Sequence, residues 1–168
     1  MVCALSIGSN QGDRLALLER ARRSLSRLPG TRERACAPVY ETEPVDVPEP
    51  WSAIPFYNSV VVVETTLDAY AFAARALAVE EHLGRVRGGG RHAPRPIDID
   101  LICFDALRLD TPWLRLPHPE AARRRFVCQP LADIDPGWII PGETRTVAEL
   151  LAALPARPSV RLADRQWL

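Results

Sequence analysis

This sequence predicts an α+β fold, a sandwich of helices on a largely antiparallel sheet. Predicted strands and helices alternate along the chain, but the connection over residues 40–56 joins two strands without a helix. Such a connection favours antiparallel neighbours, because parallel strands need a long crossover. The length of 168 residues and the 47% of hydrophobic residues are typical of one globular domain. We therefore expect a single domain over residues 1–168.

Apolar and β-branched runs predict five strands. They cover residues 2–7, 33–40, 56–64, 97–104 and 159–163. The first is a continuous apolar run, and the third is rich in valine, so both are predicted to be buried. The second is more polar. The fourth begins with alternating acidic and apolar residues, which predicts one exposed face, and the last is predicted to lie at a sheet edge.

Helical spacing of apolar residues predicts four helices, over residues 15–28, 67–83, 119–124 and 146–154. The third of these signals is weak. Asp13 is placed to cap the first helix, and Pro29 ends it. A capping box starting at Thr65 is predicted for the second, with Gly84 at its C-terminal end. A proline-rich loop is expected over 42–55 and a mobile loop over 85–95, which should become ordered when an anionic ligand binds.

The charge composition excludes several function classes. All 21 basic residues are arginine, and 21 acidic residues balance them. Without lysine there is no Schiff-base chemistry and no Walker-type phosphate loop. Without net charge, non-specific nucleic-acid binding is disfavoured. An RNA-binding ferredoxin-like domain is disfavoured further, because the chain has no run of aromatic residues on a predicted strand.

Cysteine usage and hydropathy indicate a reducing cytoplasmic setting. The cysteines, Cys3, Cys36, Cys103 and Cys128, lie far apart in the sequence and form no pair spaced for zinc. Two of them, Cys3 and Cys103, sit in apolar runs, where a reduced thiol behaves as a small hydrophobic group. No apolar stretch is long enough for a membrane span or typical of a signal peptide.

Asp98 and Asp100 form the sharpest candidate site. On a strand, residues i and i+2 point to the same face, about 7 Å apart. The intervening Ile99 would then face the core. Paired carboxylates repel each other, and their oxygens are ligands that Mg²⁺ prefers. We therefore expect a magnesium site, and we expect removal of either acid to relieve repulsion. A solvated strand face is the alternative interpretation.

Arginines are concentrated near this acidic pair. They form a first group, Arg85, Arg87, Arg91 and Arg95, before the pair and a second group, Arg123, Arg124 and Arg125, after it. Guanidinium groups bind phosphate oxygens through two parallel hydrogen bonds. Together with metal-binding acids, they predict a site for a polyphosphate–Mg²⁺ complex. A solvated loop remains the alternative for any single arginine.

Three further residues are candidates for the same site. Prolines on both sides hold His118 in a stiff turn, directly before the second arginine group. Phe56 and Phe126 are predicted near loop–strand boundaries, where either ring could stack on a flat heterocycle. Each of the three could equally be a structural residue.

These motifs together resemble the 6-hydroxymethyl-7,8-dihydropterin pyrophosphokinase family. The similar segments are SIGSNQGDR at 6–14, VYETEP at 39–44, FYNSVVVVET at 56–65, EEHLGRVR at 80–87, RHAPRPIDIDL at 91–101 and LPHPEAARRRFVCQPL at 116–131. The resemblance implies a ferredoxin-like α+β fold. It also implies transfer of pyrophosphate from ATP to a pterin hydroxymethyl group, with release of AMP, in folate biosynthesis.

The resemblance also implies a role for each matching residue. Asp98 and Asp100 would hold two Mg²⁺ ions, with Arg85 and Arg95 as their catalytic partners. ATP would contact Arg87, Arg91, Arg115, His118 and Arg124. The pterin would contact Gly8, Thr42, Val45, Phe56, Asn58, His92 and Phe126, with its ring between the two phenylalanines. ATP and the pterin are the expected partners, with neither nucleic acid nor membrane, and a monomer is the favoured state.

Three departures from the family pattern concern substrate affinity and loop closure more than chemistry. His92–Ala93 stands where many members have Trp-Gly, Pro96 stands where they have Thr, and Asp46 stands where Gly is common. The first departure keeps an alternative open, a related chain that only binds a nucleotide or pterin or that phosphorylates a different pterin.

Overall fold

A computed structural model describes residues 1–45, 47, 49–86, 93–164 and 167 of the chain. Its main feature is a six-stranded antiparallel sheet in the order β5-β1-β4-β3-β8, with β2 pairing along another stretch of β4. The strands are β1 (Val2–Ser9), β2 (Thr31–Cys36), β3 (Val39–Thr42), β4 (Phe56–Thr65), β5 (Asp98–Phe104) and β8 (Val160–Asp164). The predicted α+β class with an antiparallel sheet is confirmed.

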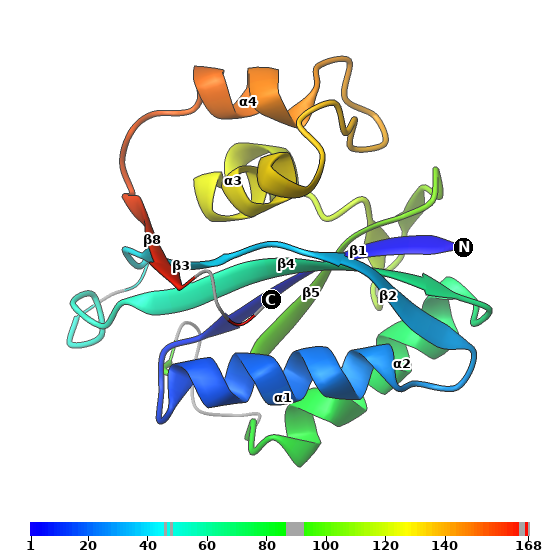
Figure 1. The fold of residues 1–168 in the computed structure, drawn as a ribbon, viewed down its shortest axis with the longest axis horizontal. Helices are drawn as coiled ribbons and strands as arrows, with labels where there is room; N and C mark the ends of the chain where they lie inside the picture. The colour runs from blue at the N-terminus through cyan, green and yellow to red at the C-terminus, as the bar shows by residue number, and fades with distance from the viewer. Residues whose placement is uncertain (46, 48, 87–92, 165–166, 168) are drawn as a thin grey trace.

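Two pairs of helices cover the two faces of this sheet (Figure 1). One face carries α1 (Arg14–Ser26) and α2 (Ala69–His82), and the other carries α3 (Arg125–Ile134) and α4 (Val147–Ala153). Each face has its own apolar core, because successive side chains of a strand point in opposite directions. Ile7 of β1 belongs to the first core, and Val60 of β4 belongs to the second.

Helix capping follows the sequence with one exception. The Asp13 side chain accepts a hydrogen bond of 3.1 Å from the N–H of Ala16, as predicted. For α2 the capping residue is Asp68, which accepts from Ala71 at 2.8 Å, so the capping box expected at Thr65 is wrong. Gly84 ends α2 with a φ of +94°, a conformation that side chains with a Cβ adopt rarely.

Two predicted elements need correction. The single strand expected over 33–40 is two strands, β2 and β3, which both pair with β4 and are separated by residues 37–38. The helix expected over 119–124 is only a 3₁₀ turn at Ala121–Arg123. The true helix, α3, follows it and contains Pro130, which lowers the helical signal because proline lacks an N–H.

A short hairpin of β6 (Leu109–Asp110) and β7 (Arg115–Leu116) lies between β5 and the 3₁₀ turn in the sequence.

The cysteines are free, and burial raises the pKa of Cys36 to about 12, so this thiol is protonated at neutral pH. Cys3 and Cys103 are buried, as predicted. Within the described part of the chain, no helix has the length and apolarity needed to cross a membrane.

Candidate functional site

The two aspartates lie at the start of β5, on one face of the sheet. The alternate residues Ile97, Ile99 and Leu101 are buried, as the strand pattern predicts. The register with β1 places Gly8 opposite Asp98 and Ser6 opposite Asp100. The strand thus carries two half-buried carboxylates on one side and is anchored by apolar residues on the other.

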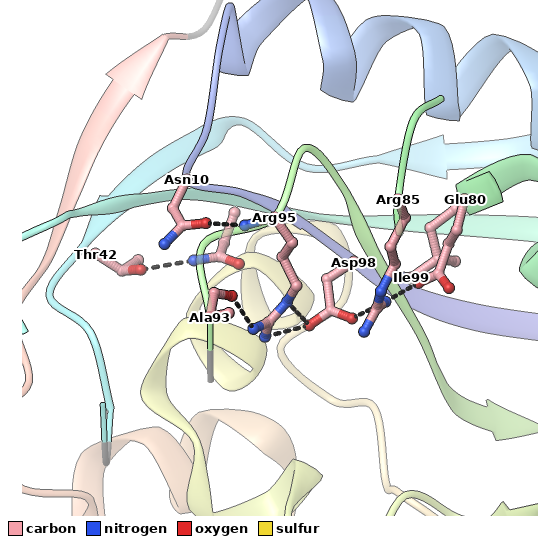
Figure 2. Close-up of polar contacts among 9 residues, drawn as sticks. Asn10, Thr42, Glu80, Arg85, Ala93, Arg95, Asp98 and Ile99 are labelled. Carbon is pink, nitrogen blue, oxygen red and sulfur yellow. Dashed lines mark hydrogen bonds and ion pairs between the residues drawn. The ribbon is translucent and has the colours of Figure 1, made fainter. Parts of the chain in front are cut away.

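Asp98 is held between two arginines (Figure 2). Arg95 donates to its Oδ2 from Nε at 2.8 Å and from Nη2 at 2.5 Å. Arg85 pairs with the other oxygen, Oδ1. The charge of Asp98 is therefore paired with two guanidinium groups. Its removal would still relieve repulsion of Asp100, but it would also break both ion pairs, so we now expect a net loss of stability.

Asp100 is in a different electrostatic position. Burial raises its pKa, the neighbouring Asp98 charge raises it further, and His118, Arg124 and Arg95 act in the opposite direction. Among the described residues, none forms an ion pair with it. Its carboxylate is therefore the one that a bound cation would stabilise most.

The donor set fits magnesium bound together with a polyphosphate. The described residues contain no group of three His, Cys, Asp or Glu side chains that could hold a metal by themselves. Mg²⁺ is usually bound by one or two carboxylates, with waters and substrate phosphates completing its shell. Asp98 and Asp100 supply that number of carboxylates.

Glu80, which the motif analysis did not single out, positions this strand and Arg85. Its side chain is 1% exposed, and Oε1 accepts a hydrogen bond of 2.7 Å from the N–H of Ile99 and pairs with Arg85. Burial raises the pKa of Glu80, and the Ile99 N–H and Arg85 lower it. Its signal in the sequence is an acid on the same face of α2 as Phe72 and Ala76, which are buried.

Replacing Glu80 with Gln should destabilise the fold by about 1–3 kcal/mol, because Arg85 loses a buried ionic partner. Turnover should fall as well, since Arg85 is no longer held beside Asp98. Urea denaturation and steady-state kinetics measure the two effects. Arg75→Gln, at an exposed position of the same helix, is the control and should change stability by less than about 0.5 kcal/mol. Equal stability of the two variants would contradict the positioning role.

Asn10 is a second positioning residue that the motif analysis did not single out. It is 4% exposed, and its Oδ1 accepts a hydrogen bond of 2.8 Å from the Arg95 N–H (Figure 2). Its own N–H donates to the Arg95 carbonyl at 3.3 Å. This pair of bonds fixes the Arg95 backbone against the end of β1. In the sequence, Asn10 is indicated only by its place in the SIGSNQGDR segment, which resembles the family.

One cavity opens on the two aspartates, and we call it the Phe56–Phe126 cavity. It is lined by both phenylalanines and by Ser6, Gly8, Thr42, Glu43, Val45, Asn58, Asp98, Asp100 and Arg124. The structure thus brings together six of the seven residues predicted to bind the pterin. Phe126 comes from α3 instead of a loop–strand boundary, because that helix was not predicted.

The polar wall of this cavity is fixed by a buried side-chain hydrogen bond and by close packing against Gly8. Asn58 donates a hydrogen bond of 2.6 Å from Nδ2 to the hydroxyl of Thr42, and both residues are buried. A Cβ on Gly8 would lie only 2.4 Å from Asn58 Oδ1. Glycine is therefore required at position 8 for Asn58 to keep this orientation.

Each phenylalanine of the cavity lies under an arginine. The guanidinium carbon of Arg95 lies 5.3 Å from the Phe56 ring centroid, and that of Arg124 lies 5.6 Å from the Phe126 centroid. Cation–π contact of this kind links the ring-binding and anion-binding parts of the site.

Asp100 also lines a second cavity, which we call the Trp113 cavity. Its other lining residues are Ala73, Ala76, Leu77, Ile99, Leu101, Trp113, Leu114, Arg115, His118 and Pro119. Two of them, Arg115 and His118, were predicted on the ATP side. The His118 Nδ1 accepts a hydrogen bond of 3.1 Å from the Glu120 N–H, so a neutral ring carries its proton on Nε2. Burial lowers the pKa of His118, which favours that neutral form.

The second arginine group contributes one residue to the aspartate site. Arg124 lines the Phe56–Phe126 cavity. Arg123 instead lies near Glu120 at 3.9 Å, and Arg125 donates to the carbonyl of Pro155 at 3.1 Å. The expectation that the whole group surrounds the acids is therefore wrong. Arg87, Arg91 and His92 lie outside the described residues, as do the glycines of the predicted loop.

Comparison with known proteins is consistent with this geometry. Residues 4–136 match the model of the family described as 7,8-dihydro-6-hydroxymethylpterin-pyrophosphokinase. A relative from Methylorubrum extorquens is 39% identical over 89% of this chain and 91% of its own length. One from Pseudomonas aeruginosa is 35% identical over 94% of both chains. Both are named 2-amino-4-hydroxy-6-hydroxymethyldihydropteridine pyrophosphokinase.

Solved structures support the fold. A chain named HPPK-DHPS, in complex with substrates, superposes with a TM-score of 0.72 at 14% identity. A Plasmodium falciparum HPPK-DHPS chain gives 0.69 at 15% identity. Each alignment covers 90% of this chain but only 44% and 45% of the longer chains, so the similarity concerns one part of them.

Proposed function

Because the chain belongs to the 7,8-dihydro-6-hydroxymethylpterin-pyrophosphokinase family, we propose that it transfers pyrophosphate from ATP to 6-hydroxymethyl-7,8-dihydropterin. The acceptor is the hydroxymethyl group, AMP is released, and the reaction belongs to folate biosynthesis. The single observation that carries the proposal is that two cavities meet at Asp100. A donor and an acceptor bound in them would meet at the paired carboxylates.

The Phe56–Phe126 cavity suits the pterin. The two phenylalanines offer apolar faces to a flat ring, and Thr42 and Asn58 offer a buried hydrogen-bonding wall. Backbone near Val45 would complete the polar contacts, and His92 is proposed as a further pterin-binding residue. The hydroxymethyl group would then point toward Asp98 and Asp100, which line the same cavity.

ATP would place its phosphates at the aspartates and its base in the Trp113 cavity. Arg85, Arg95 and Arg124 would contact phosphate oxygens, together with Arg87 and Arg91, while Arg115 and His118 would lie beside the nucleoside. Asp98 and Asp100 would hold two Mg²⁺ ions. Bound Mg²⁺ would neutralise the negative charge of the triphosphate.

The chain's own residues contribute positioning and electrostatics. The pterin hydroxyl oxygen bonds to the β-phosphorus in line, and the bond from that phosphorus to the AMP oxygen breaks. Guanidinium groups fixed by Asn10 and Glu80 stabilise charge that develops during this exchange. No described side chain stands out as a general base, since both aspartates are assigned as ligands.

Pterin-dependent release of AMP tests this proposal. The purified protein with ATP and Mg²⁺ should form AMP when 6-hydroxymethyl-7,8-dihydropterin is added and very little without it. Chromatographic quantification of AMP measures both rates. Binding of ATP and pterin without AMP release would instead support the alternative of a related binding protein.

Gly8→Ala should weaken pterin binding about tenfold or more while ATP binding changes by less than about twofold. The added methyl group displaces Asn58, which lies at 2.4 Å from the new Cβ. Asn58 can rotate, so the variant should fold. Isothermal titration with each ligand measures both affinities.

Gly137→Ala is the matched control, because this glycine is exposed, lies outside both cavities, and its Cβ would meet only the side-chain oxygen of the exposed Asp135, at 3.3 Å. It should leave both affinities unchanged. Normal pterin affinity in Gly8→Ala would contradict the assignment of this cavity to the pterin.

We also propose that the chain acts as a single domain and as a monomer in the cytoplasm. Both apolar cores share one sheet, which supports a single domain. Buried, protonated thiols suit a reducing compartment.

A further inference from the structure

Trp113 is 90% exposed, although a tryptophan side chain normally buries most of its large apolar surface. The next residue, Leu114, packs against the core beneath α2, so the hairpin itself is well anchored. Trp113 takes part in none of the contacts described above. It is, however, one of the residues that line the cavity beside Asp100.

The backbone that carries Trp113 is fixed by local hydrogen bonds. It lies at the tip of the β6–β7 hairpin, directly after Pro112, whose φ is restricted by its ring. Thr111 Oγ1 donates to the Leu114 carbonyl at 3.0 Å and accepts from the Leu114 N–H at 3.0 Å. The Thr111 N–H also donates to that carbonyl, at 3.2 Å. An aromatic side chain on a fixed turn loses little backbone entropy when a ligand binds.

The cavity beside the tryptophan has the chemistry of a nucleobase site. It offers about 310 Å³, and α2 contributes Ala73, Ala76 and Leu77 to its wall. Its other members include Asp100, where the phosphates are proposed to bind, and His118, which is proposed to lie beside the nucleoside. A nucleotide with its phosphates at Asp100 would therefore extend its base along the apolar wall toward the hairpin tip.

We propose that Trp113 is an ATP-binding residue that stacks on the adenine base. This inference rests on the proposed function and adds to it the group that recognises the base. Stacking of a base on an aromatic side chain stabilises the bound state, and we expect removal of the ring to weaken binding about 5- to 50-fold. The contact involves the base alone, so the contribution of the phosphates to binding is unaffected.

Binding of two ligands distinguishes the contribution of the base from that of the phosphates. MgATP carries both groups, and inorganic tripolyphosphate with Mg²⁺ carries the phosphates alone. Trp113→Ala should weaken MgATP binding about 5- to 50-fold and change tripolyphosphate binding by less than about twofold. Trp113→Phe keeps a ring and should retain most of the ATP affinity. Ile139→Ala removes another exposed apolar side chain, one outside this cavity, and should alter neither affinity.

Unchanged ATP affinity in Trp113→Ala would overturn the inference, and so would an equal loss for tripolyphosphate. A change in sedimentation of Trp113→Ala with normal ATP binding would also overturn it, since the ring would then serve a contact between proteins. These failures leave pterin-dependent AMP release by the unmodified protein intact. Absence of that AMP release would instead refute the proposed function.

Discussion

Asp100→Asn should lower kcat by on the order of 10³-fold and raise the melting temperature of the metal-free protein. The loss of rate follows because a metal ligand contributes several kcal/mol of charge stabilisation in the transition state. The gain in stability follows because burial and Asp98 both oppose the charge of Asp100 in the folded protein. Each kcal/mol relieved should add about 2–4 °C to the melting temperature.

Asp98→Asn is the matched comparison. It should lose a similar factor in kcat but lower the melting temperature, because Arg85 and Arg95 would lose the carboxylate between them. AMP release and calorimetry in the presence of a chelator measure the two quantities. If both variants shifted the melting temperature in the same direction, the electrostatic difference between the two aspartates would be contradicted. Near-normal turnover in either would contradict the metal assignment.

Arg95→Lys should lower kcat by about 10²- to 10³-fold with a smaller change in the ATP KM. Arg95 donates two hydrogen bonds to Asp98 and lies over the Phe56 ring. An ammonium group is a compact charge that cannot reproduce this planar, two-pronged contact. Steady-state kinetics with varied ATP separate the two parameters.

Arg123→Lys is the control for this substitution, because Arg123 is 78% exposed and lies outside both cavities. It should leave kcat within about twofold of the unmodified protein. A raised ATP KM with unchanged kcat in Arg95→Lys would place Arg95 in ground-state binding instead of catalysis.

The sequence predicted the parts of the fold that depend on local patterns. Strand periodicity placed Asp98 and Asp100 on one face of β5, and capping chemistry located the start of α1 at Asp13. The helix α3 was missed because Pro130 and the preceding arginines obscure its apolar face. Its absence from the prediction is also why Phe126 was assigned to the wrong kind of element.

The remaining site features depend on contacts between distant segments. Glu80 reaches the backbone of β5 from α2, and Asn10 reaches Arg95 across 85 positions of sequence. Asp98 and Asp100 differ in their electrostatic surroundings because Arg85 and Arg95 form ion pairs with Asp98. A D-x-D pattern does not indicate which of its two carboxylates will be paired. Such pairings are set by tertiary packing, so they became visible only in the structure.

The central claim is that pyrophosphate passes between two ligands that both bind beside Asp100. The most direct test is to identify which phosphoryl groups are transferred to the pterin. Phosphorus NMR of a reaction with ATP, Mg²⁺ and 6-hydroxymethyl-7,8-dihydropterin identifies the products without separation. We predict two coupled signals from a pterin diphosphate, growing in equal amount with AMP. Formation of ADP with a pterin monophosphate, or of inorganic phosphate alone, would contradict the account.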